Sequence, residues 1–282
     1  MTRIRLGLIG DNIKASRAPA LHRLAGGLCG LDVQYDRFIP AETGLDFDAL
    51  FDRCRADGLT GLNITLPYKE RAVRRVTIDD PLIARIGAIN TVRFGNDGPR
   101  GFNTDHSGFV GAFRETLGTR APGRVALFGA GGVGKAVAFG LVALGAREIR
   151  IIDTDTNKAA MLARNVTEAG GGRTGGTVTG TEGLTDADGV VNCTPLGMVG
   201  YGGSPVPQGR FPAADWAFDA VYTPGDTPFK AQAEASGARF LSGYELFFWQ
   251  GVHAFEIFAG TRPGDLNALR AALDRDRAAA DA

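Results

Sequence analysis

Cysteine, histidine and net charge are all scarce in this chain of 282 residues. The three cysteines, Cys29, Cys54 and Cys193, are too few and too scattered for a disulfide framework. None of them shows metal-ligand spacing with any of the three histidines. We therefore expect free thiols, a cytoplasmic location and no bound metal.

Charge of one sign does not dominate, since 31 lysines and arginines balance 31 aspartates and glutamates. Such a chain has no net field to attract nucleic acid or an anionic membrane surface. Long hydrophobic runs are also missing: no stretch approaches the roughly 18 apolar residues that a membrane helix needs, and the N-terminus lacks the apolar region of a signal peptide. The expected partner is a small molecule, with no nucleic acid and no membrane, and the chain is expected to be a monomer or a homodimer.

Strands and helices alternate along the chain, which predicts an α/β fold. Because 282 residues exceed the usual size of one domain, two domains are expected. In the first set, apolar alternation predicts strands and amphipathic spacing predicts helices. The predicted strands cover residues 3–10, 32–40 and 61–67, and the predicted helices cover residues 18–30 and 44–58.

A second set begins with one complete βαβ unit over residues 123–153, followed by short apolar strands at 189–194 and 216–222. The glycine-rich segment 168–180 reads as a loose surface connection. Two helices, 244–260 and 265–282, are assigned back to the first domain. The predicted organisation is a substrate or catalytic domain of residues 1–107 completed by 243–282, a Rossmann dinucleotide-binding domain of residues 108–242, and a cleft between them.

The sequence "GAGGVG" matches the dinucleotide-binding pattern between a predicted strand and a predicted helix. There, missing Cβ atoms let a pyrophosphate reach backbone N–H groups at the positive end of a helix. The predicted coenzyme-binding residues of this turn are Gly129, Ala130, Gly131, Gly132, Val133 and Gly134. A structural turn and a methyltransferase site are the alternatives, and the third glycine argues against both.

Asp153 follows the next predicted strand, where a carboxylate accepts hydrogen bonds from ribose hydroxyls. The same carboxylate repels a 2′-phosphate, and the residues after it include no arginine. We therefore expect NAD as the preferred coenzyme, with NADP possible because Lys158 is near in sequence.

Lys69 stands two residues after Pro67, which ends the strand pattern of "GLNITLP". For an arbitrary lysine in such a place, a solvated surface charge is the default interpretation. Hydride transfer at carbon, however, needs a group that moves a proton on the adjacent oxygen, and no histidine here has a carboxylate partner in a recognisable motif. Lysine can serve, and Asp105 is a carboxylate expected near the junction of the two domains.

Four separated segments coincide with one family: "SRAP", "NITLPYK", "GAINT" with "GFNTD", and "GAGGVG" with "VNCTPLG". On these motifs the sequence resembles the shikimate/quinate dehydrogenases, in the right order from about residue 6 to residue 260. The combination of N-x-T-x-P-x-K with N-T-D is far more specific than a glycine turn alone.

The resemblance implies that Lys69 and Asp105 form the catalytic pair, with Lys69 moving the proton of a ring C3 hydroxyl. Whether Lys69 is a true base or an electrostatic clamp stays open. The resemblance also implies a polyhydroxylated cyclic carboxylic acid as substrate. Its contacts would be Ser16, Thr65, Asn90, Asp105, Tyr222 and Gln250, and the nicotinamide side would be lined by Thr194, Ala220 and Gly243.

One departure concerns the N-terminal motif, in which the family usually has two serines and this chain has Ser16 but Ala18. Losing a hydrogen bond to a charged group costs about 1.5–3 kcal/mol if nothing replaces it. Interconversion of shikimate and 3-dehydroshikimate is the leading expectation, and oxidation of quinate or aminoshikimate on the same scaffold is the alternative. A nucleotide-binding regulator without turnover is a third reading, which the intact Lys69 and Asp105 disfavour.

Overall fold

The computed structural model describes residues 2–281, with side chains described up to Asp276. The chain divides into two compact units, which we call unit 1 (Met1–Thr104 and Phe248–Ala282) and unit 2 (Asp105–Phe247). The chain passes from one unit to the other within two helices, α5 (Thr104–Leu117) and α9 (Gly243–Ala259). None of the described helices is long and apolar enough to cross a membrane.

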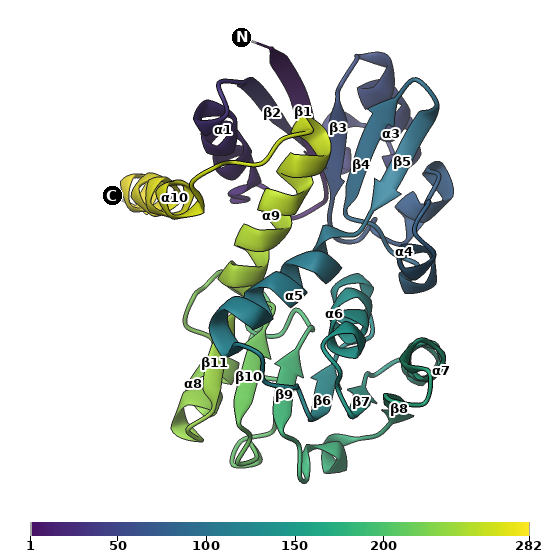
Figure 1. Cartoon of the computed structure of the whole chain (residues 1–282), viewed down its shortest axis with the longest axis vertical. Helices are drawn as coiled ribbons and strands as arrows, with labels where there is room; N and C mark the ends of the chain where they lie inside the picture. Colours follow the sequence, from purple (N-terminus) through teal and green to yellow (C-terminus); the bar gives the residue numbers. More distant parts are fainter. Residues whose placement is uncertain (1, 282) are drawn as a thin grey trace. The chain divides into compact units, whose positions relative to one another are not determined.

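Unit 1 is built on a five-stranded mixed sheet with the strand order β2-β1-β3-β4-β5 (Figure 1). β1 runs parallel to β2 and β3, whereas β4 and β5 form an antiparallel hairpin beside β3. The strands are β1 (Arg3–Ile9), β2 (Asp32–Phe38), β3 (Gly61–Ile64), β4 (Thr91–Gly95) and β5 (Gly98–Phe102). The helices are α1 (Ala18–Leu28), α2 (Pro40–Thr43), α3 (Phe47–Ala56), the 3₁₀ helix η1 (Arg71–Arg75), α4 (Pro81–Ile86), most of α9, and α10 (Leu266–Asp281), which packs against α1.

Local sequence explains where these elements begin and end. Asp46 caps α3 by accepting a hydrogen bond from the Ala49 amide at 2.9 Å, and α1 has a proline in its first turn. Gly30 ends the α1 segment in the left-handed conformation that favours glycine, with φ of 67°. β3, the central strand, is buried at every position, which indicates that both faces of the sheet are covered there.

Unit 2 is built on a six-stranded parallel sheet with the order β11-β10-β9-β6-β7-β8 (Figure 1). Read from β8, this is the strand order 3-2-1-4-5-6 of a Rossmann sheet, whose order reverses at β6. The strands are β6 (Arg124–Phe128), β7 (Glu148–Ile152), β8 (Gly175–Val178), β9 (Gly189–Asn192), β10 (Trp216–Asp219) and β11 (Arg239–Ser242). Most of α5, α6 (Gly132–Ala143), α7 (Thr156–Gly170), the 3₁₀ helix η2 (Thr181–Leu184) and α8 (Pro228–Ala235) complete the unit.

The expected α/β fold with a Rossmann sheet is confirmed, and each strand and helix predicted from periodicity is present. One interpretation was wrong: residues 168–180 are not only a surface connection, because they contain β8. Gly176 in particular allows close packing, since a Cβ there would lie 2.3 Å from the Ala163 carbonyl oxygen of α7. The helix expected over 265–282 is observed to Asp281, and Ala282 lies outside the described residues.

Candidate active site

Lys69 lies in the segment that follows β3, and its side chain is buried, with 7% of the residue exposed. Its carbonyl oxygen accepts a hydrogen bond from the Ile89 amide at 3.0 Å, which ties the segment to the residue before Asn90. The preceding residue, Tyr68, stacks on Phe47 with 4.8 Å between ring centroids. The burial of Lys69 excludes the interpretation of this residue as an ordinary solvated surface charge.

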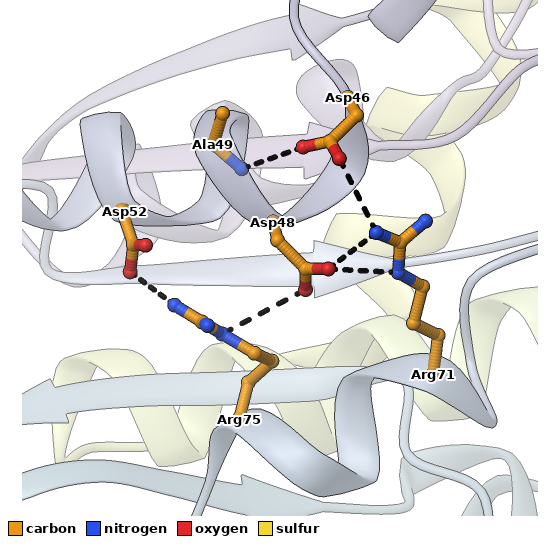
Figure 2. Close-up of polar contacts among 6 residues, drawn as sticks. All are labelled: Asp46, Asp48, Ala49, Asp52, Arg71 and Arg75. Atoms are coloured by element: carbon orange, nitrogen blue, oxygen red, sulfur yellow. Dashed lines mark hydrogen bonds and ion pairs between the residues drawn. The ribbon is translucent and has the colours of Figure 1, made fainter.

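A cluster of arginines and aspartates fixes the chain immediately after Lys69. In η1, Arg71 contacts Asp46 and Asp48, and Arg75 contacts Asp48 and Asp52, all from α3 or its cap (Figure 2). Both guanidinium groups also lie over phenylalanine rings of α3, 5.6 and 5.3 Å from the ring centroids. A single exposed ion pair contributes little to stability, but the carboxylate of Asp48 joins both arginines into one network. The network holds η1 against α3 and so limits the movement of the Lys69 segment.

Asn90 and Gln250, two of the substrate contacts that the resemblance implies, lie in contact in unit 1. Asn90 Nδ2 lies 3.4 Å from Gln250 Oε1 and 2.9 Å from Thr104 Oγ1, and Asn90 Oδ1 accepts the Thr104 amide at 2.7 Å. The antiparallel strands explain this arrangement, because Thr91 is paired with Asn63 of β3 on one side and with Phe102 of β5 on the other. Gln250 is therefore no unsatisfied polar group in an apolar helix.

The other predicted substrate residues occupy positions of different kinds. Ser16 is partly exposed. Its hydroxyl accepts a hydrogen bond from the Ala18 amide at 3.3 Å, and its carbonyl oxygen accepts one from Arg37 Nη2 at 2.7 Å. Thr65 continues from β3, with its amide donating to the Ile9 carbonyl at 2.9 Å. Asp105 is buried, 5% exposed, in the first turn of α5 directly after Thr104. Tyr222, in unit 2, stacks on Phe247 at 5.2 Å.

The predicted coenzyme residues all follow strands of the unit 2 sheet. Because the strands are parallel, their carboxyl ends meet at one edge. The glycine turn follows β6, Asp153 follows β7, Thr194 follows β9, Ala220 follows β10 and Gly243 follows β11. The structure therefore gathers these five positions at the edge where open α/β sheets bind their ligands.

The glycine turn fits the pyrophosphate of a dinucleotide. A Cβ on Gly134 would lie 1.8 Å from the Gly129 carbonyl oxygen, so the turn can close this tightly only with glycine there. Gly131, in contrast, has no atom within 4 Å of the position of an added Cβ, which leaves room beside the N-terminus of α6. No acidic residue stands in the first turn of α6, whose N-terminus favours a bound anion.

Asp153 is placed beside this turn. Its Oδ2 accepts the Ala130 amide at 2.6 Å and its Oδ1 accepts the Asp155 amide at 2.8 Å, while the residue stays partly exposed. Lys158 contacts Asp155 at 3.9 Å. The carboxylates of Asp153 and Asp155 give this region the negative charge expected of an NAD site.

Among the described residues, no group of His, Cys, Asp and Glu side chains could hold a metal ion.

Comparisons with known proteins agree with this arrangement. Residues 8–92 match the model of the shikimate dehydrogenase substrate binding domain. A quinate/shikimate dehydrogenase (NAD+) of Corynebacterium efficiens is 37% identical over 95% of this chain and 96% of its own length. A shikimate dehydrogenase (NADP+) of Natronomonas pharaonis is 39% identical over 90% of this chain and 92% of its own. The chain belongs to the shikimate/quinate dehydrogenase family.

Solved structures of this family share the fold over nearly the whole chain. Quinate dehydrogenase from Corynebacterium glutamicum in complex with NAD has a TM-score of 0.86 at 34% identity, covering 96% of this chain and 99% of that one. Shikimate 5-dehydrogenase from Thermus thermophilus in complex with NADP(H) and shikimate has a TM-score of 0.84 at 31% identity, with the same coverage of both chains.

Sequence reasoning missed part of the polar interior of this family member. Asn63 and Thr91 lie within the motifs "NITLPYK" and "GAINT", yet neither was given a role, and Tyr35 and His22 carry no motif at all. All four are buried in unit 1. The position of Asn63 and Thr91 inside the two motifs was the available signal; nothing local marks the other two, because their partners lie far along the chain.

His22 gives unit 1 a predicted sensitivity to acid. Burial lowers the pKa of His22 to about 3, with a hydrogen bond to Asn63 opposing the shift, and its Nδ1 has no partner among the described residues. Below its unfolded-state pKa near 6.5, only the unfolded chain takes up the proton, so stability falls as the pH falls. Between pH 6.5 and 5, wild type should lose about 1.6 kcal/mol more unfolding free energy than His22→Phe. Denaturant titrations at both pH values measure this, and equal losses would contradict it.

Proposed function

We propose that this chain is an NAD-preferring dehydrogenase that interconverts shikimate and 3-dehydroshikimate. The observation that carries the proposal is the burial of Lys69, the lysine of the N-x-T-x-P-x-K motif. Its carbonyl oxygen accepts a hydrogen bond from the residue before Asn90, and Asn90 contacts Gln250. Unit 1, which corresponds closely to the expected domain of residues 1–107 and 243–282, then supplies most of the contacts to the cyclic acid, and unit 2 binds the coenzyme.

Lys69 takes the proton from the ring C3 hydroxyl as the C3–H bond breaks, and returns it in the reverse reaction. The Asp105 carboxylate holds the lysine and the neighbouring ring hydroxyl in place. Asn90 and Gln250 hydrogen-bond the ring hydroxyls, with Thr65 and Tyr222 as further contacts, and the Ser16 hydroxyl binds the substrate carboxylate. A bound NAD supplies the hydride acceptor.

The glycine turn from Gly129 to Gly134 holds the pyrophosphate through backbone amides at the N-terminus of α6. The Asp153 carboxylate accepts hydrogen bonds from the ribose hydroxyls, and Thr194, Ala220 and Gly243 line the nicotinamide side. Two features support this assignment: the open space beside Gly131, and the lack of an acidic residue in the first turn of α6.

Asp153 is expected to set the coenzyme preference. Wild type should have a lower KM for NAD than for NADP, because the carboxylate repels a 2′-phosphate. Asp153→Asn, which keeps an oxygen for the Ala130 amide, should shift kcat/KM toward NADP by about tenfold, or about 1.4 kcal/mol. Asp155→Asn removes an acid two residues away and serves as the control. A wild-type KM for NADP below that for NAD would show that Asp153 does not have this role.

Oxidation of quinate is the second candidate. Two observations favour it: Ala18 replaces the hydroxyl that the family usually places there, and relatives that act on quinate are similar over almost the full length. Quinate differs from shikimate at C1, next to the carboxylate that the N-terminal motif contacts.

Steady-state assays with shikimate and with quinate, each with NAD and NADP, test the proposal. We expect the highest kcat/KM for shikimate with NAD. A higher value for quinate would support the second candidate. If neither coenzyme is reduced with any cyclic polyol acid, the remaining interpretation is a nucleotide-binding regulator without turnover. A cytoplasmic monomer or homodimer remains our proposal for the state of the enzyme.

A further inference from the structure

A chain of hydrogen bonds runs through the interior of unit 1 from Tyr35 to Asn90. It passes through Asn63 and Thr91, and all four residues are buried, with exposed fractions of 2%, 6%, 0% and 3% for Tyr35, Asn63, Thr91 and Asn90. Only Asn90 belongs to the substrate contacts proposed above. The other three residues occupy the space behind it, with His22 stacked on Tyr35 at 5.0 Å.

The backbone fixes the orientation of the Asn63 amide. The Asn90 carbonyl oxygen can only accept a hydrogen bond, so the group facing it at 3.3 Å must be Asn63 Nδ2. Asn63 Oδ1 then faces Tyr35, whose hydroxyl donates to it at 2.8 Å. The second hydrogen of Nδ2 is donated to Thr91 Oγ1 at 3.2 Å.

The direction of these bonds continues to Asn90. Because Thr91 Oγ1 accepts from Asn63, its own hydrogen is available for Asn90 Oδ1, 3.0 Å away. The Thr104 amide, which can only donate, reaches the same Oδ1 at 2.7 Å. With donors on this side, Asn90 must turn its Nδ2 toward the acceptors Thr104 Oγ1 at 2.9 Å and Gln250 Oε1 at 3.4 Å.

We propose that Tyr35, Asn63 and Thr91 are positioning residues that prevent the Asn90 amide from flipping, so that the substrate site offers a hydrogen-bond donor beside Gln250. The inference rests on the proposed contact between Asn90 and the substrate. It selects substrates that present an accepting oxygen at this point, a hydroxyl or a ketone, and disfavours groups that can only donate, such as an ammonium. Thr91 links Asn63 to Asn90, because its single hydroxyl both accepts from Asn63 and donates to Asn90, whose Oδ1 the Thr104 amide also holds.

Thr91→Val tests the link, since valine replaces the hydroxyl with a methyl group of similar size. We expect the KM for the cyclic acid to rise about fivefold to tenfold, the range for losing one buried hydrogen bond, with the KM for NAD unchanged. Thr91→Ser restores the hydroxyl and should bring the KM back to within about twofold of wild type, a margin well below that loss. A merely structural role would not separate these two variants in the KM for the acid alone.

Thr174→Val is the matched control. Thr174 is also buried, 3% exposed, but it lies in unit 2 and donates to the Ala146 carbonyl at 2.6 Å. It should lower the melting temperature without changing the KM for the acid. If Thr91→Val does not fold, Tyr35→Phe removes one hydroxyl at the far end of the chain and should raise the same KM by a smaller factor.

A second measurement does not depend on turnover. In nitrogen-15 NMR spectra, the side-chain amide protons of Asn90 should exchange slowly in wild type and in Thr91→Ser, and faster in Thr91→Val. Unchanged exchange in Thr91→Val, or an equal rise in KM for the serine and valine variants, would overturn the inference. If wild type turns over no cyclic acid, the proposed function fails, and the exchange data still decide whether Thr91 orients Asn90.

Discussion

Lys69→Ala is expected to lower kcat by about three orders of magnitude, the middle of the range for losing a general acid or base. The residue is buried, and its segment is held by the Ile89 amide and by the network around η1. NAD affinity should not change, because the predicted coenzyme residues all lie in unit 2.

The companion variants separate two roles for this lysine. Lys69→Arg keeps the positive charge, but a guanidinium group does not give up its proton at physiological pH. If Lys69 is a true base, Lys69→Arg should be about as inactive as Lys69→Ala; recovery of most of the activity would show that charge alone suffices. Lys230→Ala, which removes a lysine paired with Asp226 in unit 2, is the control and should keep wild-type kcat. Unchanged turnover in Lys69→Ala would remove the residue from the mechanism.

Gly134→Ala is expected to disrupt unit 2 at the glycine turn. In an ordinary helix this change gains about 1 kcal/mol, because alanine is the better helix former. Here the added Cβ would lie 1.8 Å from the carbonyl oxygen of Gly129, a backbone atom that cannot move without opening the turn. Overpacking of this kind costs about 1–3 kcal/mol or more, so it outweighs the gain in helix propensity. We expect a lower melting temperature and loss of measurable NAD binding.

Gly131→Ala is the matched variant in the same turn. Its added Cβ meets no atom within 4 Å, and its φ of −76° suits alanine, so the fold should be unaffected. The methyl group would instead occupy the space assigned to the pyrophosphate, and the dissociation constant for NAD should rise. Calorimetric titration and thermal melting measure the pair. A wild-type melting temperature in Gly134→Ala, or wild-type NAD affinity in Gly131→Ala, would contradict the account of the turn.

Much of the fold was predictable because its signals are local. The βαβ unit around "GAGGVG" is written in consecutive residues: an apolar strand, glycines where the backbone must approach closely, and a helix ended by Gly145. The signals for α3 are local in the same way, because its capping residue Asp46 directly precedes its amphipathic sequence. Local signals failed at β8, where the glycines that suggest a loop instead let Gly176 pack against α7.

The interior of unit 1 was not predictable in the same way. Asn63 and Asn90 are 27 residues apart and Asn90 and Gln250 are 160 apart, so their contacts depend on the strand register and on the position of α9. Motifs identified Lys69, Asn90 and Gln250 as site candidates, but not the direction of the hydrogen bonds behind them. That direction follows from backbone groups that can only donate or only accept, and these are known only once the strands are paired.

The most direct test of the central claim uses shikimate labelled with deuterium at C3. After incubation with the wild-type chain and NAD, mass spectrometry of the isolated coenzyme should find the reduced form carrying one deuterium, with 3-dehydroshikimate formed in equal amount. Reduced coenzyme without deuterium, or none at all while the labelled acid and NAD both bind, would contradict hydride transfer from C3.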